Sequence, residues 1–542
     1  MPPHRMSIPR CDDGTAAWRA GSFYRMTASS PDRTLVPTDG IETFDPASID
    51  AWAALRALGH RMLDDMLDLQ SSLTHRPAWE ELPPLARRLF DEPAPMEGIG
   101  ADAAYALFRS HIVPYGNGNW HPRFFGWVQG QGTPLAMLAE MLAAGMNPHL
   151  AGFNQAPPLV ERQVVGWLAT LMGIPGAGGL LVTGGTAANT HALGVARFAA
   201  VRARGGNVRH DGLQQWPDGP TAKPLVFYGS VETHGWARKA AEWLGLGDRA
   251  FQRVPVNAEY QMDLAALRRM LERDRAQGLD PFCVMGTAGT VNTGATDDLR
   301  AIAQLCREES LWFHVDGAFG ALAALAPSAR DQVAGLEQAD SIAFDLHKWG
   351  AMPFECACVL VRDETVNHDA FRSTATYLAE TSRGVGAGGA YFADRGLDLT
   401  RGFKALKVWM QLQADGVAKL GRIIDQNVRQ AREFADAVTA HASLELLAPA
   451  PLNVVCFRYR THAVDDADLN ALNEELLLRL QERGIAVPTS TRLGGRFALR
   501  LAHVNHRTTD DDMALVLSAV VEIGDELVAN SRAAGPTSRG AL

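Results

Sequence analysis

The stretch Ser341-Ile-Ala-Phe-Asp-Leu-His-Lys-Trp349 decides how this chain is interpreted. An apolar, strand-like run ends here in Asp345, His347 and Lys348, so a lysine stands at the edge of a predicted sheet beside an aromatic residue. Partial desolvation of a lysine favours the neutral amine that forms an imine. A solvated surface lysine after a strand is the plainer interpretation, and this stretch alone favours it.

A second stretch, Trp312–Gly320, places Asp316 directly after a strongly apolar run. An unpaired carboxylate there is costly, so Asp316 needs a cationic partner. The protonated pyridine nitrogen of pyridoxal 5′-phosphate (PLP) is such a partner. Gly317 and Ala318 are small enough for a flat ring to lie against the backbone. The alternative is a buried aspartate that caps a helix.

A third stretch, Leu181–Asn189, runs from a strand through Gly184 and Gly185 into a helix. Its backbone amides and the hydroxyl of Thr186 can hold a phosphate at the helix N-terminus. The spacing matches neither the dinucleotide fingerprint nor the P-loop. Together the three stretches offer a phosphate cradle, a pyridinium partner and an imine-forming lysine, and this combination predicts a PLP site.

Around these stretches, between residues 111 and 410, short apolar runs alternate with helical patterns. This alternation predicts an α/β domain with a mostly parallel central sheet. Ligands of such sheets bind at the carboxyl ends of the strands. The predicted strands are Leu180–Thr183, Pro224–Tyr228, Phe282–Met285, Trp312–Val315, Ser341–Phe344 and Cys358–Arg362.

The remaining chain divides into four further segments. Residues 1–45 lack periodicity and are expected to be a disordered tail, within which Met26 leaves the origin of residues 1–25 open. Residues 46–110 carry a helical apolar stripe. Residues 411–530 are predicted to form a small C-terminal α+β domain, with strands at Asn453–Arg458 and Arg496–Ala502. Residues 531–542 are expected to be a second tail.

Composition excludes several classes of function. The formal net charge is −10 and the basic residues are scattered, which argues against a nucleic-acid or anionic-membrane partner. No apolar run is long enough to span a bilayer. The six cysteines include no CxxC pair, and we expect no metal site. These features predict a cytoplasmic protein.

With the motifs in order, the chain resembles the group II PLP-dependent amino-acid decarboxylases, the aromatic-L-amino-acid and glutamate decarboxylase type of fold-type I PLP enzyme. The resemblance covers residues 46–528 and implies the fold-type I PLP-dependent transferase architecture. It rests on His121-Pro-Arg-Phe-Phe-Gly-Trp127, Thr183–Asn189, His314–Gly320, His347-Lys348-Trp349, Arg401–Trp409 and Leu499–Asn505.

The resemblance implies a role for each residue of the site. Lys348 is the lysine that forms the internal aldimine, and Asp316 is the pyridinium partner. His234 stacks on the ring face opposite Ala318, and Thr287 lies near the phenolic oxygen. The residues implied around the phosphate are Gly185, Thr186, Asp345 and His347. The animal enzymes usually have asparagine in place of Asp345. An anionic side chain is repelled by phosphate, so binding of a water or a backbone amide is its alternative role.

The implied reaction is decarboxylation of an L-amino acid to the amine, in an active site at the interface of a homodimer clasped by residues 46–110. An aromatic substrate is slightly favoured, because Trp127 retains one of the aromatic residues of the family at that point. Arg500 is a candidate partner for the substrate carboxylate, and a structural salt bridge is its alternative explanation.

The product depends on proton delivery to the substrate α-carbon, which the family assigns to a tyrosine on a mobile loop. Here the loop is predicted at Glu380–Thr400, and counting back from Arg401 places Phe392 at the expected position. Tyr391 is one residue away, and we expect it to be the donor. If Phe392 occupies that position, oxygen intercepts the slowly protonated intermediate and an aldehyde forms. A PLP-binding protein without catalysis is a third alternative, which the combined presence of Lys348, Asp316 and His234 disfavours.

Overall fold

The computed structural model describes residues 43–213, 223–372, 383–387 and 391–533. The chain divides into two compact units, Met1–Met66 and Leu67–Leu542. The described part of the first unit is residues 43–66, most of which belong to helix α1 (Ile49–Ser71). The outer parts of the two expected tails, and Gly388 and Gly389 of the expected loop, lie outside the described residues.

The second unit contains a seven-stranded sheet with the strand order β1-β7-β6-β5-β4-β2-β3. All of its strands run parallel except β7, which pairs antiparallel with both neighbours. The predicted α/β fold with a mostly parallel sheet is therefore confirmed. The strands are β1 (Gly178–Val182), β2 (Leu225–Ser230), β3 (Phe251–Val254), β4 (Asp280–Thr287), β5 (Trp312–Asp316), β6 (Ser341–Asp345) and β7 (Ala357–Val361).

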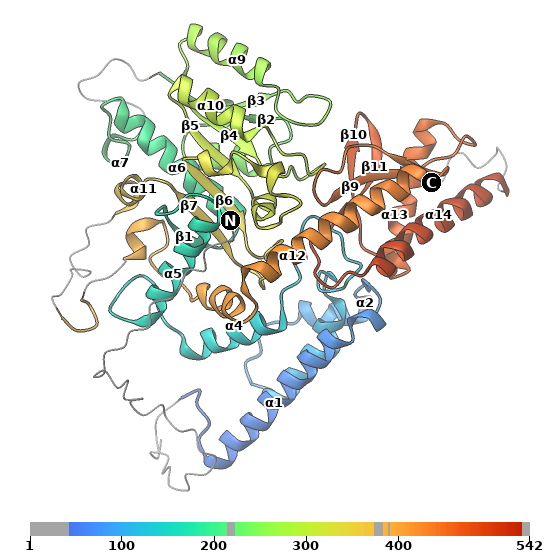
Figure 1. The fold of residues 1–542 in the computed structure, drawn as a ribbon. Coiled ribbons are helices and arrows are strands. Elements are labelled where there is room, and N and C mark those ends of the chain that lie inside the picture. Colours follow the sequence, from blue (N-terminus) through green and yellow to red (C-terminus); the bar gives the residue numbers. More distant parts are fainter. Residues whose placement is uncertain (1–42, 214–222, 373–382, 388–390, 534–542) are drawn as a thin grey trace, which may run out of the picture. The chain divides into compact units, whose positions relative to one another are not determined.

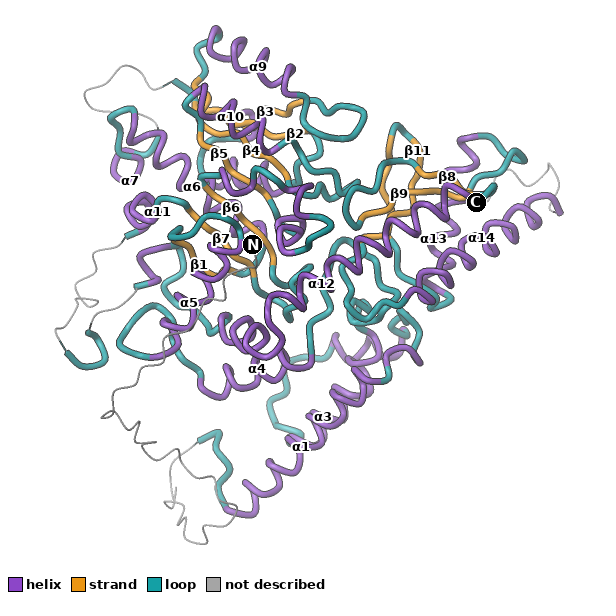
Figure 2. Tube along the Cα trace, viewed as in Figure 1, coloured by secondary structure: helices purple, strands orange, loops and turns teal. Residues whose placement is uncertain are grey.

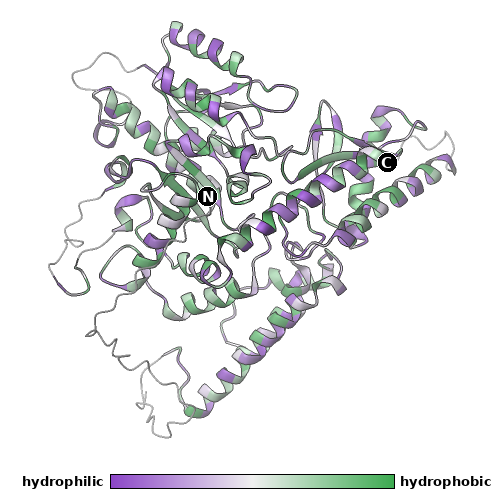
Figure 3. Cartoon of the chain, viewed as in Figure 1, coloured by the Kyte–Doolittle hydropathy of each residue, from purple (hydrophilic) through white to green (hydrophobic). Residues whose placement is uncertain are grey.

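Helices bury both faces of this sheet. On one face, Leu181, Val284 and Ile342 belong to a core that includes residues of α5 (Ala156–Leu171), α9 (Leu264–Ala276) and α10 (Leu299–Glu309). The neighbouring residues on the same strands pack against α6 (Gly185–Ala203) and α8 (Trp236–Trp243). Burial on both faces explains why the strands are nearly continuous apolar runs. Figure 3 shows hydrophobic colouring along these central strands and mixed colouring along the flanking helices.

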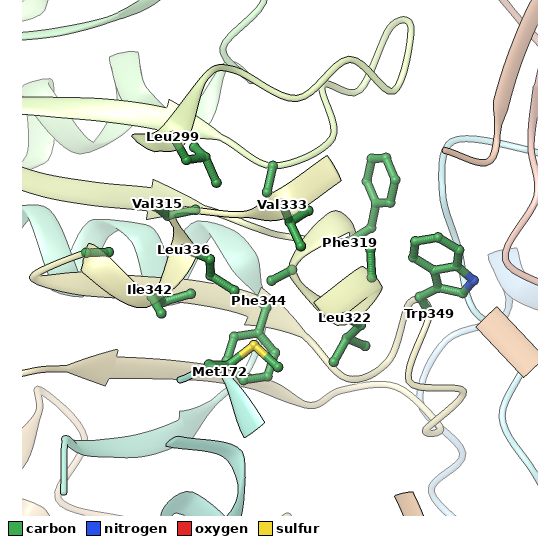
Figure 4. Packing of buried hydrophobic residues seen from close by; sticks show 14 of the residues in the cluster. Met172, Leu299, Val315, Phe319, Leu322, Val333, Leu336, Ile342, Phe344 and Trp349 are labelled. Carbon is green, nitrogen blue, oxygen red and sulfur yellow. The ribbon is translucent and has the colours of Figure 1, made fainter. Parts of the chain in front are cut away.

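Figure 4 shows the core beneath the end of β6. Ile342 and Phe344 point from β6 into a cluster with Phe319 and Leu322, which follow β5. Trp349 is fully buried, and its ring centroid lies 6.1 Å from that of Phe319. The residue after Lys348 is thus anchored in the core, so the position of the lysine backbone is fixed.

A second, antiparallel sheet has the order β10-β11-β9-β8 and is separate from the first (Figure 2). Its core is formed with α13 (Asp466–Glu482) and α14 (Asp510–Ala533). The long helix α12 (Ala405–Ala440) packs on α5 and on β8, so it joins the two sheets within this unit (Figure 1). The strands are β8 (Leu444–Leu446), β9 (Val454–Tyr459), β10 (Thr489–Leu493) and β11 (Arg496–Ala502).

The remaining α-helices precede the first sheet, connect two of its strands or follow its last strand, β7. None of the helices among the described residues is both long and apolar enough to cross a membrane. These remaining helices are α2 (Pro84–Arg87), α3 (Ala101–Leu107), α4 (Pro134–Met146), α7 (Val208–Asp211) and α11 (Glu364–Phe371).

Candidate active site

The carboxyl ends of three adjacent parallel strands bring predicted site residues together. Thr287 ends β4, Asp316 ends β5 and Asp345 ends β6. Thr287 pairs with Asp316 across the two strands, and the backbone N–H of Asp345 donates to the carbonyl of Ala318 at 2.9 Å. The sheet register therefore places these side chains along one edge.

Lys348 lies at this edge and forms an ion pair with Asp345. Its Nζ is 2.8 Å from Asp345 Oδ2, and its side chain is 24% exposed, whereas that of Asp345 is 2% exposed. Gly130 packs on the backbone of this segment, since a Cβ there would lie 2.5 Å from the carbonyl oxygen of Lys348. The segment that follows His121 is thus held against the lysine.

The predicted phosphate turn meets the side chains of Asp345 and His347. A Cβ added to Gly185 would lie 2.8 Å from Asp345 Oδ2, and one added to Gly184 would lie 3.6 Å from the ring of His347. Gly185 begins helix α6, so the first backbone amides of that helix have no partner within the helix. Thr186 is exposed in the first turn of the same helix.

Asp316 is buried and accepts hydrogen bonds from neutral donors. Asn189 Nδ2 and the Ala318 N–H donate to its Oδ1 at 3.2 and 3.1 Å, and Trp236 Nε1 donates to its Oδ2 at 2.7 Å. A carboxylate has about four acceptor positions, so one remains on Oδ2. Helix capping, the alternative role for Asp316, is not observed, because the helix that follows β5 has Phe319 at its N-cap and no side-chain cap.

His234 follows β2 and lies within electrostatic range of the same charged groups. Loss of hydration is the main cause that lowers its pKa, Asp316 opposes it, and Lys348 lowers the pKa further. The backbone N–H of Trp236 donates to His234 Nδ1 at 3.2 Å, so the neutral ring carries its proton on Nε2. In the single chain its ring is exposed to solvent.

Thr287 is fixed by its backbone and presents a hydroxyl without a partner. Its N–H donates to Asp297 Oδ2 at 2.8 Å, while Thr287 Oγ1 is buried and has no hydrogen-bond partner among the described residues. The Met262 N–H donates to the other oxygen of Asp297 at 2.7 Å, and burial raises the pKa of Asp297 to about 6. Asp345 Oδ1 is a second buried oxygen without a hydrogen-bond partner there.

These observations test whether PLP fits the site. Thr287 offers an unsatisfied hydroxyl, Asp316 offers one acceptor position, and Lys348 offers an amine at the strand ends. The glycine turn at Gly185 offers the N-terminal amides of α6 for a phosphate, and it packs against the Asp345 carboxylate. An aldehyde, a ring nitrogen and a phosphate each have a matching group, so the residues fit PLP. Among the described residues no group of three or more His, Cys, Asp or Glu side chains is arranged to hold a metal ion.

Arg500 lies on β11 of the second sheet and contacts the loop that follows Thr287. Its Nε donates to the carbonyl of Asn292 at 3.2 Å, and one terminal nitrogen donates to Thr489 Oγ1 at 3.1 Å. No carboxylate of the described chain is within ion-pair distance, and Nη2 is buried without a partner there. Burial lowers the pKa of Arg500 to about 10. A structural salt bridge does not explain this arginine.

Trp127 lies in the segment held against Lys348, but the structure gives it no direct contact with the lysine. It is 57% exposed, with a backbone φ of 50°, and the next residue, Val128, has a φ of 84°. Two successive non-glycine residues in this region are a strained arrangement of the kind found at ligand sites. The ring of Trp127 lies 6.2 Å from that of Phe124.

Tyr391 and Phe392 have different environments. Phe392 is fully buried in a cluster with residues of β1, β7 and α6, and the guanidinium groups of Arg395 and Arg401 lie 5.2 and 5.5 Å from its ring centroid. Tyr391 is half-buried, with its ring edge-on to Phe153 at 6.3 Å. The side chain of Phe392 is therefore part of the core, and that of Tyr391 is not.

The conserved domain of pyridoxal-dependent decarboxylases matches residues 84–460. This chain belongs to the pyridoxal-dependent decarboxylase family. The aromatic-L-amino-acid decarboxylase of Bacillus atrophaeus is 29% identical over 87% of this decarboxylase and 96% of its own length. The phenylacetaldehyde synthase of Petunia hybrida is 28% identical over 82% of this chain and 88% of its own. The Oryza sativa tryptophan decarboxylase structure with PLP and tryptamine has a TM-score of 0.81 and 26% identity, covering 90% of this chain and 100% of that one.

Three residues that support Asp316 in this decarboxylase were not predicted. His314 could have been found, because residues two apart on a strand point to the same face and His314 precedes Asp316 by two. Asn189 lies in the predicted phosphate motif, but its amide reaches Asp316 from another element. Trp236 follows His234 by two residues, and nothing in the sequence indicates its contact with Asp316.

Proposed function

We propose that this decarboxylase converts an L-amino acid, with an aromatic one favoured, to the corresponding amine, using PLP held by Lys348. The observation that supports the proposal is that Lys348 and Asp316 both lie at the carboxyl ends of adjacent strands. Lys348 is poised against Asp345 on β6, while on β5 Asp316 is held by neutral donors and retains one acceptor position. Bound PLP supplies an electron sink for the pair left on the α-carbon when the carboxylate departs.

The residues around the ring have separate tasks. The Lys348 amine would attach the cofactor, and the Asp316 carboxylate would hold a proton on the ring nitrogen. His234, whose pKa is lowered, would present a neutral ring for stacking, opposite Ala318. Thr287 Oγ1, which has no hydrogen-bond partner among the described residues, would donate to the phenolic oxygen.

The phosphate is assigned to the glycine turn. The N-terminal amides of α6 at Gly185 and Thr186 are donors, and the helix dipole favours an anion there. His347 borders the turn. The Asp345 carboxylate lies against this turn. A phosphate bound there would therefore be next to the carboxylate, unless the Asp345 side chain turns away.

Two residues outside the proposed PLP-binding group support the choice of substrate. Arg500 has a buried terminal nitrogen without a partner among the described residues, which suits a substrate carboxylate. Trp127 supplies an exposed aromatic face next to the segment that packs on Lys348. The Bacillus relative, named as an aromatic-L-amino-acid decarboxylase, supports the aromatic preference.

Tyr391 is proposed to deliver the proton to the α-carbon. The buried position of Phe392 supports this choice, since a core phenylalanine cannot also line the substrate site of the same chain. The second candidate function is aldehyde formation, which the similarity to phenylacetaldehyde synthase favours. In that reaction the amino acid, O2 and water give the aldehyde, CO2, ammonia and hydrogen peroxide.

A homodimer is proposed as the working form. Ile49, Trp52 and Leu55 recur at helical spacing on α1 and are exposed in the single chain. Exposed apolar residues with this spacing suit a helix that packs on a partner. A cytoplasmic location is also proposed, supported by the five described cysteines, all of which are buried and unpaired.

The test is an assay of CO2 release from a panel of L-amino acids, with amine, aldehyde and peroxide measured in the same samples. We expect CO2 and amine in equal amounts from an aromatic substrate, and no CO2 from the Lys348→Ala variant. Equal aldehyde and peroxide would establish the second function. Wild-type protein that binds PLP but releases CO2 from no amino acid would contradict both.

A further inference from the structure

A continuous chain of hydrogen bonds runs through the buried core to Asp316. Trp312 Nε1 lies 2.8 Å from Ser341 Oγ, which lies 2.9 Å from His314 Nδ1. His314 Nε2 lies 2.7 Å from Asn189 Oδ1, and Asn189 Nδ2 lies 3.2 Å from Asp316 Oδ1. Ser341, His314 and Asn189 are all fully buried, so water does not compete for these bonds.

The direction of the bonds in this chain is determined from its last acceptor, Asp316. The Asp316 carboxylate accepts from Asn189 Nδ2, so Asn189 Oδ1 faces His314 Nε2 and is the acceptor there. The proton of His314 is then on Nε2 and is donated to Asn189 Oδ1. Burial lowers the pKa of His314 to about 4, which keeps this ring neutral at physiological pH. Nδ1 of the neutral ring therefore accepts from the Ser341 hydroxyl, whose oxygen accepts from the indole N–H of Trp312.

Trp236 approaches Asp316 from the other side. It is 2% exposed, its Nε1 is 2.7 Å from Asp316 Oδ2, and its ring is edge-on to that of His314 at 6.1 Å. The described residues thus give Asp316 donors at both oxygens, and none of these donors carries a charge. A carboxylate held in this way is oriented without a competing protein cation.

We propose that Trp236 and Asn189 are positioning residues, which hold Asp316 as an oriented anion so that its remaining acceptor position on Oδ2 faces the ring nitrogen of PLP. This inference rests on the proposed role of Asp316 and extends it to two side chains from α8 and α6. Trp236 is the sharper of the two, because its indole N–H contacts the oxygen on which the free position lies.

The test compares PLP with 1-deazapyridoxal 5′-phosphate, in which a C–H group replaces the ring nitrogen. Trp236→Phe removes the N–H donor and keeps an aromatic ring. Trp243→Phe is the matched control, since Trp243 ends the same helix and is 78% exposed. The dissociation constant of each cofactor is measured by titration of the apoprotein, with thermal unfolding as a check on folding.

We expect Trp236→Phe to weaken PLP binding by about tenfold or more, the effect of losing a hydrogen bond to a charged group, and to leave binding of the deaza analogue unchanged. Trp243→Phe should change neither. If Trp236→Phe weakens both cofactors equally, the tryptophan acts by packing alone and the inference fails. If Trp236→Phe prefers PLP over the deaza analogue as strongly as the wild type does, or more strongly, the inference is also overturned.

Asn189→Leu removes the side-chain donor to the other oxygen of Asp316 and keeps a side chain of similar size. If Trp236→Phe does not fold, the binding of the two cofactors is compared in Asn189→Leu instead. Failure of the inference is distinguishable from failure of the proposed function. If wild-type protein binds the two cofactors with equal affinity, Asp316 has no role at the ring nitrogen and the proposed function fails with it. If the wild type prefers PLP strongly and both variants keep that preference, only the positioning role is wrong.

Discussion

Lys348 Nζ lies 2.8 Å from Asp345 Oδ2, so the lysine of the candidate site is paired with a carboxylate three residues before it. Asp345 is also next to Gly185, at the N-terminus of helix α6. A single buried carboxylate therefore acts on the two places where a cofactor must be bound, the amine and the phosphate turn. The charge of Asp345 opposes a phosphate and holds Lys348 in an ion pair.

Asp345→Asn should tighten PLP binding by about tenfold, equivalent to ~1.4 kcal/mol, because the variant removes a charge that repels the phosphate. Imine formation should also be faster, because Lys348 Nζ is released from its contact with the Asp345 carboxylate. Both effects are measured by following the absorbance of PLP added to the apoprotein. Asp274→Asn is the control, since Asp274 is equally buried but is bonded to Tyr228 on another part of the sheet. Weaker PLP binding by Asp345→Asn would show that the carboxylate supports the phosphate.

Tyr391→Phe should slow amine formation by roughly 10²–10⁴-fold, the contribution of a positioned general acid. In air, aldehyde and peroxide should then accumulate at the expense of amine. Phe392→Tyr serves as the comparison, and we expect it to leave the product ratio unchanged, because Phe392 is fully buried in the core. Three results together would contradict the assignment of Tyr391. The wild type would make aldehyde, Tyr391→Phe would change the products little, and Phe392→Tyr would raise the amine fraction.

Buried histidines should make the fold sensitive to acid. Burial lowers the pKa of His121, His191 and His314 to about 4, and that of His503 to about 3. An unfolded histidine titrates near 6.5, so between about pH 6.5 and 4 the unfolded chain binds more protons than the folded one. The stabilisation from each neutral ring is complete above this window and is lost as the pH falls through it. At pH 5 each of these buried histidines lowers the free energy of unfolding by up to ~2 kcal/mol.

The urea midpoint should therefore fall between pH 7.5 and pH 5. Asp297 acts in the opposite direction, because burial raises its pKa to about 6 and its ionisation destabilises the fold at higher pH. His191→Gln should reduce the dependence on pH, since it removes one buried histidine that is hydrogen-bonded to Asn367. A urea midpoint that rises on acidification would contradict the neutral state of these rings.

The parts of the fold that the sequence predicted are those with a local signal. The strands that end at Asp316 and Asp345 are long apolar runs followed by a polar residue, and all six predicted strands of the large sheet are present. β3 was not predicted, because Phe251–Val254 is a short edge strand that contains two polar residues, Gln252 and Arg253. Its position depends on pairing with β2, which local pattern does not encode.

The site was predictable only as far as its motifs extend. Lys348 and Asp316 stand at strand ends, where parallel topology brings side chains together. The surroundings of Arg500 depend on Asn292, which is 208 residues away in the chain, so the absence of a salt bridge was not visible in the sequence. The same applies to Trp236, whose indole reaches Asp316 across 80 residues.

The most direct test of the central claim is to identify the lysine that binds the cofactor. Holoprotein should absorb above about 400 nm, and borohydride should fix the pyridoxyl group to the protein, where peptide mass spectrometry locates it. We predict one pyridoxyl group per chain on Lys348, and none in Lys348→Ala treated in the same way. A pyridoxyl group on a different lysine of the wild type, or on none, would contradict it.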